Sequence, residues 1–251
     1  MIKHVEPILK KFSAALLVTI LLAGLSACAV NPARTAGFKT DRAGQTAENG
    51  KQYWWFCRFK ITWPAGTPVD MTADLMLAHA VVEPVLDRFR SKIRFWRFHR
   101  RAARDGAGHQ FNFIFYTDPG TAAAIMADLK KSAVLRQALS ENIVEKINFD
   151  NPDIPRRPNP EDTSDKNWPV EIQKNWPAYI MGVSATWLGL IDELMSGMPA
   201  VADMHKLFDQ YRQVDARITS MWSRNGQHAF IHHLSAIFGY EPLIINEEIR
   251  F

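Results

Sequence analysis

The stretch KQYWWFCRFKITW, residues 51–63, determines the first element of the fold, because a large apolar side chain stands at every second position. Alternation with a period of two, combined with aromatic enrichment, is typical of a β-strand that turns alternate side chains toward a core. Basic and polar residues occupy the even positions from Arg58 onward. We therefore predict a strand whose odd face lies in the core and is made by Tyr53, Trp55, Cys57, Phe59, Ile61 and Trp63.

The residues that follow predict the rest of a sheet with two helices. Residues 70–90 have the apolar spacing of a helix, which Pro84 should kink or split. KIRFWRFHR (92–100) and HQFNFIFYT (109–117) predict two strands, and Asp105-Gly106 favours a hairpin turn between them. A helix over 121–139 and a strand over 142–149 complete the series. The order strand, helix, strand, strand, helix, strand over 51–149 is the split βαβ arrangement of ferredoxin-like folds, so we predict an α+β fold with an antiparallel sheet.

The C-terminal third has a different composition. Six prolines fall within residues 150–178, which predicts a linker or an extended loop. Three helices are expected after it, at about 178–196, 200–223 and 227–238, with Gly197-Met198-Pro199 and Asn225-Gly226 between them. About 73 residues (179–251) are few for an independent core, so we expect this helical region to pack on the uncovered face of the sheet or on its rim.

The N-terminus has the pattern of a secretory signal over residues 1–27. Three lysines precede an apolar run at 12–25, which is too short to span a bilayer, and small residues follow it. The ending Leu25-Ser26-Ala27-Cys28 resembles the lipobox of bacterial lipoproteins. The resemblance implies that Cys28 becomes the lipidated N-terminus, and Ala29 after it implies the outer membrane, with the body facing the periplasm. Residues 28–50 then form a flexible tether.

Charge and cysteine content restrict the function further. The chain has a formal net charge of +4, but residues 1–27 hold three Lys and one Glu, so the remainder carries only +2. A mildly basic periplasmic protein is a poor candidate for binding nucleic acid, and no nucleic-acid partner is expected. Cys57 is the only cysteine besides Cys28, and its place in the apolar alternation predicts a buried thiol without a disulfide partner.

A basic cluster on the predicted sheet is the first candidate site. Arg58 and Lys60 belong to the even face of the first strand, and the second strand adds further basic residues. Such a set can line an anion-binding surface. The alternative is a solvated face on which the arginines pair with nearby carboxylates. The candidate anion-binding residues are Arg58, Lys60, Arg97, His99 and Arg100.

Histidines form the second candidate. His228 and His232 lie one helical turn apart, a spacing that can chelate a metal, although a structural or interfacial pair is the favoured interpretation. His99 and His109 flank the predicted hairpin, where they could titrate near a cleft. No phosphate-binding loop, dinucleotide fingerprint or CxxC pair is found, so we expect no cofactor.

Two classes of function remain open at this point. The first is a lipid-anchored envelope protein that binds a partner protein or takes part in envelope assembly. The second is a periplasmic enzyme or an anionic-ligand-binding protein, with its site between the basic sheet face and the helical layer. A deep pocket holding His99 or His109 with Arg58 and a carboxylate would favour the second. Sheet-to-sheet pairing into a homodimer is compatible with either.

Overall fold

A four-stranded antiparallel sheet organises the chain, and it has the strand order β2-β3-β1-β4. The computed structural model describes residues 50–101 and 108–241. The strands are β1 (Tyr53–Ile61), β2 (Phe95–Arg101), β3 (Gln110–Thr117) and β4 (Val144–Phe149). The central strand β1 pairs with β3 on one side and with β4 on the other. The predicted α+β class and the antiparallel sheet are confirmed.

One face of the sheet holds the main core. The odd positions of β1 face it as predicted, with Trp55, Cys57 and Phe59 buried, but the strand ends at Ile61 and Trp63 lies beyond it, where its Nε1 donates to the Thr67 carbonyl. Burial raises the pKa of the Cys57 thiol, as expected for a thiol with no solvent access. Phe111, Phe113 and Phe115 of β3 continue the same aromatic layer.

Two helical connections cover this core face. The first consists of α2 (Thr72–Met76), a π-helical turn η1 (Leu77–Val82), α3 (Glu83–Phe89) and the 3-10 turn η2 (Arg90–Lys92). Pro84 lies in the first turn of α3, immediately after the π turn, so the predicted interruption takes this form. Proline is tolerated in the first turn of a helix, where its missing N–H removes no hydrogen bond of that helix.

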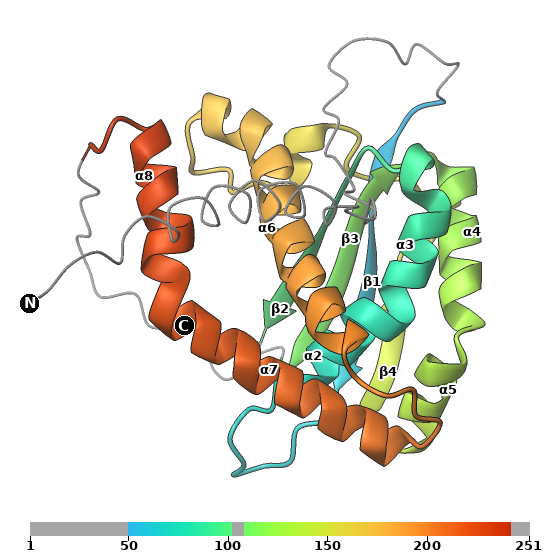
Figure 1. The fold of residues 1–251 in the computed structure, drawn as a ribbon. Coiled ribbons are helices and arrows are strands. Elements are labelled where there is room, and N and C mark those ends of the chain that lie inside the picture. Colours follow the sequence, from blue (N-terminus) through green and yellow to red (C-terminus); the bar gives the residue numbers. More distant parts are fainter. Residues whose placement is uncertain (1–49, 102–107, 242–251) are drawn as a thin grey trace, which may run out of the picture. The chain divides into compact units, whose positions relative to one another are not determined.

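The second connection differs from its prediction. The single helix expected over 121–139 is two helices, α4 (Pro119–Lys130) and α5 (Ala133–Ser140). Ser132 separates them, because its Oγ accepts a hydrogen bond from the Leu135 N–H and so caps α5. Figure 1 shows α3 and α4 beside each other over the sheet.

The C-terminal helices are present as predicted, but the first begins eight residues earlier than expected and the third begins as a π turn. They are α6 (Val170–Ser196), α7 (Met204–Gly226), the π turn η4 (Gln227–His232) and α8 (His233–Ile237). Pro177 lies inside α6 rather than before it. Because Pro177 has no N–H to give to the Gln173 carbonyl, that oxygen instead accepts a hydrogen bond from Ser164 Oγ at 2.8 Å. Gly226 is the last residue of α7, as predicted, and it gives room to the Trp222 ring, which would lie 3.0 Å from an added Cβ.

These helices pack at the rim of the sheet. Helix α6 lies along the edge strand β2 and α7 lies against α2 (Figure 1). Leu188 and Ile191 of α6 and Tyr211 of α7 are buried in the same core cluster as the sheet residues. One compact unit, 48–251, contains every described residue.

The second face of the sheet is covered in part by the proline-rich segment, and not by the helices. Residues 150–163, which include the 3-10 turn η3 (Pro160–Thr163), lie on it. Trp54 Nε1 donates to the carbonyls of Asn159 and Pro160, at 3.1 and 2.9 Å. Tyr116 Oη donates to the Pro158 carbonyl at 2.6 Å. We call residues 150–163 the strap.

A hydrogen bond from α6 protects the edge strand β2. The Phe98 N–H donates to Ser184 Oγ at 3.1 Å in a buried contact, so this edge amide does not need another strand. Ser184→Ala leaves the amide unpaired, and we expect the free energy of unfolding to fall by about 1–3 kcal/mol. Urea denaturation followed by circular dichroism measures it.

Thr186→Ala is the matched control for that variant. Thr186 Oγ1 makes the same kind of contact to a carbonyl one turn back in α6, at 2.9 Å, but it is exposed and contacts no strand. Its replacement should change stability by less than about 0.5 kcal/mol. Equal losses in the two variants would show that the bond to β2 contributes nothing.

Candidate functional site

The sheet places four of the five candidate anion-binding residues on one face. Strand register aligns Arg58 with Asn112 and Asn112 with His99, and it aligns Lys60 with Gln110. Arg97 lies on the same face, two residues before His99 on β2 and opposite Ile114 of β3. The basic residues of the two strands therefore do form a group, as the alternation predicted.

Two members of that group, Arg58 and Arg97, contact the strap. Arg58 Nη1 lies 2.9 Å from Asp150 Oδ1, and Arg157 also pairs with Asp150. Both guanidinium groups lie over the Phe56 ring, at 4.6 and 4.2 Å from its centroid. Arg97 is largely buried, which lowers its pKa, and it points Nη2 toward the Thr163 carbonyl. The structure thus shows the alternative interpretation for Arg58, in which the arginine pairs with a nearby carboxylate.

Arg100 does not belong to this surface, so its assignment was wrong. Adjacent residues of a strand point to opposite faces, and Arg100 points toward the helices. Its Nε lies 3.4 Å from Asp74 Oδ2, and its guanidinium group lies 4.9 Å from the Trp187 ring centroid. Arg100 is therefore part of a second charged group.

The second charged group is buried at the end of the core. Asp74 and His109 are almost fully buried, and His109 Nε2 lies 3.0 Å from Asp74 Oδ2. Asp74 Oδ1 has no hydrogen-bond partner among the described residues. The sequence singled out His109 but not Asp74. The available signal was that Asp74 stands next to the apolar residues Leu75, Met76 and Leu77 of the predicted helix.

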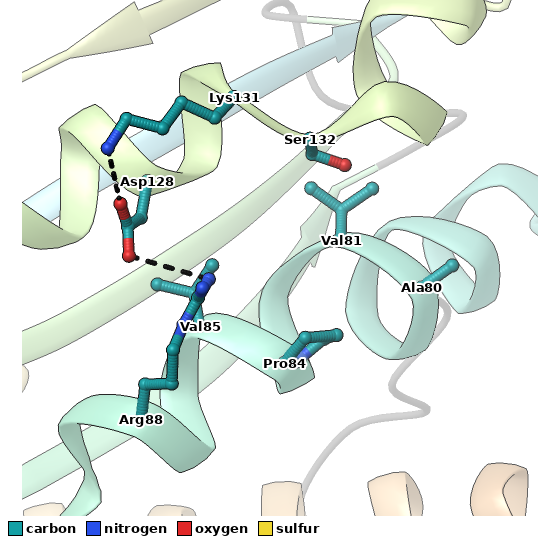
Figure 2. Close-up of a pocket in the computed structure, with 8 residues that line it drawn as sticks. All are labelled: Ala80, Val81, Pro84, Val85, Arg88, Asp128, Lys131 and Ser132. Atoms are coloured by element: carbon teal, nitrogen blue, oxygen red, sulfur yellow. Dashed lines mark hydrogen bonds and ion pairs between the residues drawn. The ribbon is translucent and has the colours of Figure 1, made fainter.

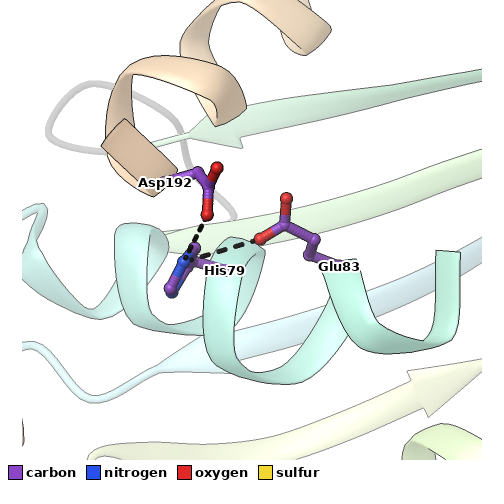
Figure 3. Close-up of side chains that lie close together, drawn as sticks. All are labelled: His79, Glu83 and Asp192. Carbon is purple, nitrogen blue, oxygen red and sulfur yellow. Dashed lines mark ion pairs between the residues drawn. The ribbon is translucent and has the colours of Figure 1, made fainter. Parts of the chain in front are cut away.

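A third group joins three helical segments around His79 (Figure 3). His79 Nε2, on η1, lies 3.6 Å from Glu83 Oε2 and 3.7 Å from Asp192 Oδ1 of α6. On the other side of the ring, a hydrogen bond of 2.7 Å joins His79 Nδ1 to the Tyr211 hydroxyl of α7. The three ligand atoms of His79, Glu83 and Asp192 lie within 4.8 Å of one another.

The electrostatics of this group follow from its partial burial. Burial lowers the pKa of His79, which favours the neutral imidazole. Burial, and then the neighbouring Asp192 carboxylate, raise the pKa of Glu83 to about 7. Two carboxyl groups and a neutral imidazole are therefore held close together. The sequence analysis missed this group, although the four-residue spacing of His79 and Glu83 on a predicted helix was a usable signal.

The predicted histidine pair has a different character. His228 and His232 are exposed on η4, and their rings stack with centroids 5.2 Å apart and an interplanar angle of 13°. His233 lies beside both. Among residues 50–101 and 108–241, one group of three possible metal ligands has its ligand atoms within 4.8 Å of one another. That group is His79, Glu83 and Asp192, and not the three histidines.

Large apolar side chains surround those histidines and are exposed. Ile237 is 83% exposed and Phe238 is 71% exposed, and the others range from 39% to 61%. Trp222 stacks on Phe230, so the surface continues from α7 into η4. We call this surface the C-terminal apolar face; it consists of Trp222, Phe230, Ile231, Leu234, Ile237, Phe238 and Tyr240.

A shallow pocket of about 190 Å³ lies between η1–α3 and the α4–α5 connection (Figure 2). Arg88 and Lys131 flank Asp128 at its rim, at 3.4 and 3.0 Å. Ligand pockets usually measure about 300–1,000 Å³. None of His99, His109 and Arg58 lines this pocket, so it is not the cleft that the enzyme hypothesis required.

Comparison with known proteins adds no relative. No family model, no curated protein and no solved structure matches the chain. The class that the structure defines is an α+β protein with a four-stranded antiparallel sheet and two long helices packed after it.

Membrane-spanning character was also tested on the described residues. None of their helices is both long and apolar enough to cross a bilayer. The predicted signal (1–27), Cys28 and the tether up to residue 49 lie outside the described residues.

Proposed function

We propose that this protein is a lipid-anchored protein of the bacterial outer membrane whose periplasmic body binds another envelope protein. The observation that carries the binding role is the C-terminal apolar face, because monomeric soluble proteins rarely leave so many large apolar side chains exposed together. The lipobox-like ending at Cys28 supports the anchor. We also assign the sheet and its two helical connections to the ferredoxin-like split βαβ fold, on the strand order β2-β3-β1-β4.

The tether sets the reach of the body. Cys28 and Gly50 are separated by 22 residues, which in an extended chain span at most about 75 Å. A body held this way reaches proteins near the membrane without inserting into it. Two or more acyl chains give stable anchoring, which a lipidated and acylated Cys28 would supply.

The composition of the apolar face favours a protein partner over the bilayer surface. Residues 222–240 contain only Arg224 as a permanently charged side chain. Helices that lie in a membrane interface are rich in Lys and Arg on their polar side. Trp222, Phe230 and Tyr240 are residue types enriched in protein interfaces, and the helix-in-groove mode uses such a stripe. The partner we propose is therefore an envelope protein with an apolar groove.

The other predicted site finds no support in the geometry. Arg58 and Arg100 lie on opposite faces of the sheet, and each is paired with a carboxylate. An anionic ligand between the basic face and the helices would have to displace Asp150 or Asp74. We therefore do not propose an enzymatic or anion-binding role.

Site-specific photo-crosslinking in living cells tests the proposal. The full chain carries a photoreactive residue at Ile237 or, as the matched control, at Gln213, which is exposed on α7 away from the face. We expect one envelope protein crosslinked from position 237 and not from 213. The purified partner should then bind the full-length protein, and Phe238→Asp should weaken that binding at least tenfold.

Three results would overturn the proposal. An adduct of two copies of this chain would make the face a homodimer interface. Adducts with lipid alone would make it a membrane contact. If a Cys28→Ser variant still fractionates with the outer membrane, then lipidation of Cys28 is not what anchors the protein.

A further inference from the structure

We propose that His79 Nε2, a Glu83 carboxylate oxygen and an Asp192 carboxylate oxygen form a zinc-binding site that ties α6 to the helical segment Leu77–Phe89. The inference is independent of the proposed binding role, since the site lies on other helices than the C-terminal apolar face. It rests on the convergence of three ligand atoms from two parts of the chain (Figure 3).

The distances between the ligand atoms suit a metal ion with tetrahedral coordination. Zinc binds histidine nitrogen and carboxylate oxygen at 2.0–2.2 Å, which places tetrahedral ligands about 3.3–3.6 Å apart. His79 Nε2 already lies 3.6 Å from the Glu83 oxygen and 3.7 Å from the Asp192 oxygen. These two distances need almost no change, and the two carboxylate oxygens, which lie within 4.8 Å of each other, approach by up to about 1.2 Å on binding. Three protein ligands leave a fourth position open to water.

Tyr211 gives the site its orientation. Metal-ligating histidines usually donate their other ring N–H to an oxygen, which fixes the tautomer and the ring plane. With the proton on Nδ1, His79 donates to the Tyr211 hydroxyl oxygen at 2.7 Å, and the Nε2 lone pair faces the two carboxylates. Because Tyr211 is itself buried in the core, its hydrogen bond holds the His79 ring in one orientation.

The charges also suit a divalent cation. His79 offers a ring nitrogen, and the carboxylates of Glu83 and Asp192 offer two negative charges that balance a dication. Glu83 and Asp192 repel each other across the site, and a dication between them removes that repulsion. The Asp192 side chain is 67% exposed, so an ion can enter from solvent. Zinc fits better than magnesium or calcium, which prefer six or more oxygen ligands.

The exposed histidines of η4 and the first residue of α8 are the competing zinc site. His228, His232 and His233 have ring centroids within 5.4 Å of one another, so they could hold a metal without being the proposed site. The test must therefore separate the two groups.

Isothermal titration of chelator-treated, full-length protein with Zn²⁺ tests the site. We expect one tight site per chain. Its affinity for Zn²⁺ should fall at least 100-fold in His79→Ala and at least tenfold in Asp192→Asn. Glu193→Gln is the matched control, since it removes the same charge from the next exposed position of α6 and should bind like the parent. Tyr211→Phe should weaken binding about tenfold, and Co²⁺ should show the visible absorption of tetrahedral coordination.

Different outcomes decide between the sites. Because Asp192 is exposed, Asp192→Asn should fold even if His79→Ala does not, and circular dichroism checks both. Unchanged affinity in folded Asp192→Asn would overturn the proposal. So would loss of tight binding in the His228→Ala/His232→Ala variant, or titration of the parent protein with no tight site.

Discussion

Replacing Asp74 by alanine is expected to lower the free energy of unfolding by about 3–5 kcal/mol. Asp74 is fully buried and faces both His109 at 3.0 Å and Arg100 at 3.4 Å. Its removal takes away the carboxylate that pairs with the buried His109 ring and with Arg100. Removing one partner of a buried polar pair costs more than the pair contributes, because the other partner stays desolvated.

Urea denaturation of the full chain measures this loss. Asp87→Ala is the control, since Asp87 is an exposed aspartate of α3 and its replacement should stay within about 0.5 kcal/mol of the parent. A double-mutant cycle with His109→Ala should give a coupling energy of about 1–3 kcal/mol. A loss below 1 kcal/mol in Asp74→Ala would mean that the site relaxes or admits water, contrary to the expectation.

The sheet was predictable because its signal is local. In β1 and β3 the aromatic alternation is strong enough to specify which side of each strand faces the core, and Phe59 and Phe113 are buried as expected. The same rule should have separated Arg100 from His99, since neighbouring residues of a strand cannot share a face. Grouping residues by proximity in sequence, without applying that rule, produced the wrong assignment.

The group around His79 could not be assembled from the sequence. His79 and Glu83 share a predicted helix, but Asp192 and Tyr211 come from α6 and α7, which are more than 100 residues further along. Their meeting depends on how α6 lies along β2. No pattern in one sequence gives that placement.

The proline-rich segment is a loop up to residue 169, which is one of the two predicted forms, and only residues 170–178 differ because they belong to α6. Prolines and polar residues are typical of linkers, and such a segment has few apolar side chains to bury. The strap is held instead through its backbone carbonyls and through Asp150, which accept hydrogen bonds from sheet residues. Proline suits this role because it stiffens the chain and keeps its carbonyl as an acceptor. The prediction to test is that the sheet binds the strap mainly through one indole.

Trp54→Ala is expected to cost about 3–5 kcal/mol and to release the strap. Trp54 is 1% exposed, and its ring lies against Tyr116 and Phe95, with centroids 5.2 and 6.3 Å away. Its backbone N–H also donates to the Arg157 carbonyl, so the strap meets this residue on two sides. Truncation removes the aromatic contact and the indole donor together.

Trp54→Phe separates the two contributions. It keeps a ring in the aromatic cluster but leaves the Asn159 and Pro160 carbonyls without the indole N–H, for a cost of about 1 kcal/mol. Trp222→Ala is the control for loss of a tryptophan, because Trp222 is 58% exposed and its removal should be nearly neutral. Hydrogen exchange should show amides of residues 150–163 losing protection in Trp54→Ala while those of β3 keep theirs. If β3 loses protection equally, the strap and the sheet unfold as one unit, and the second face of the sheet depends on the strap for its stability.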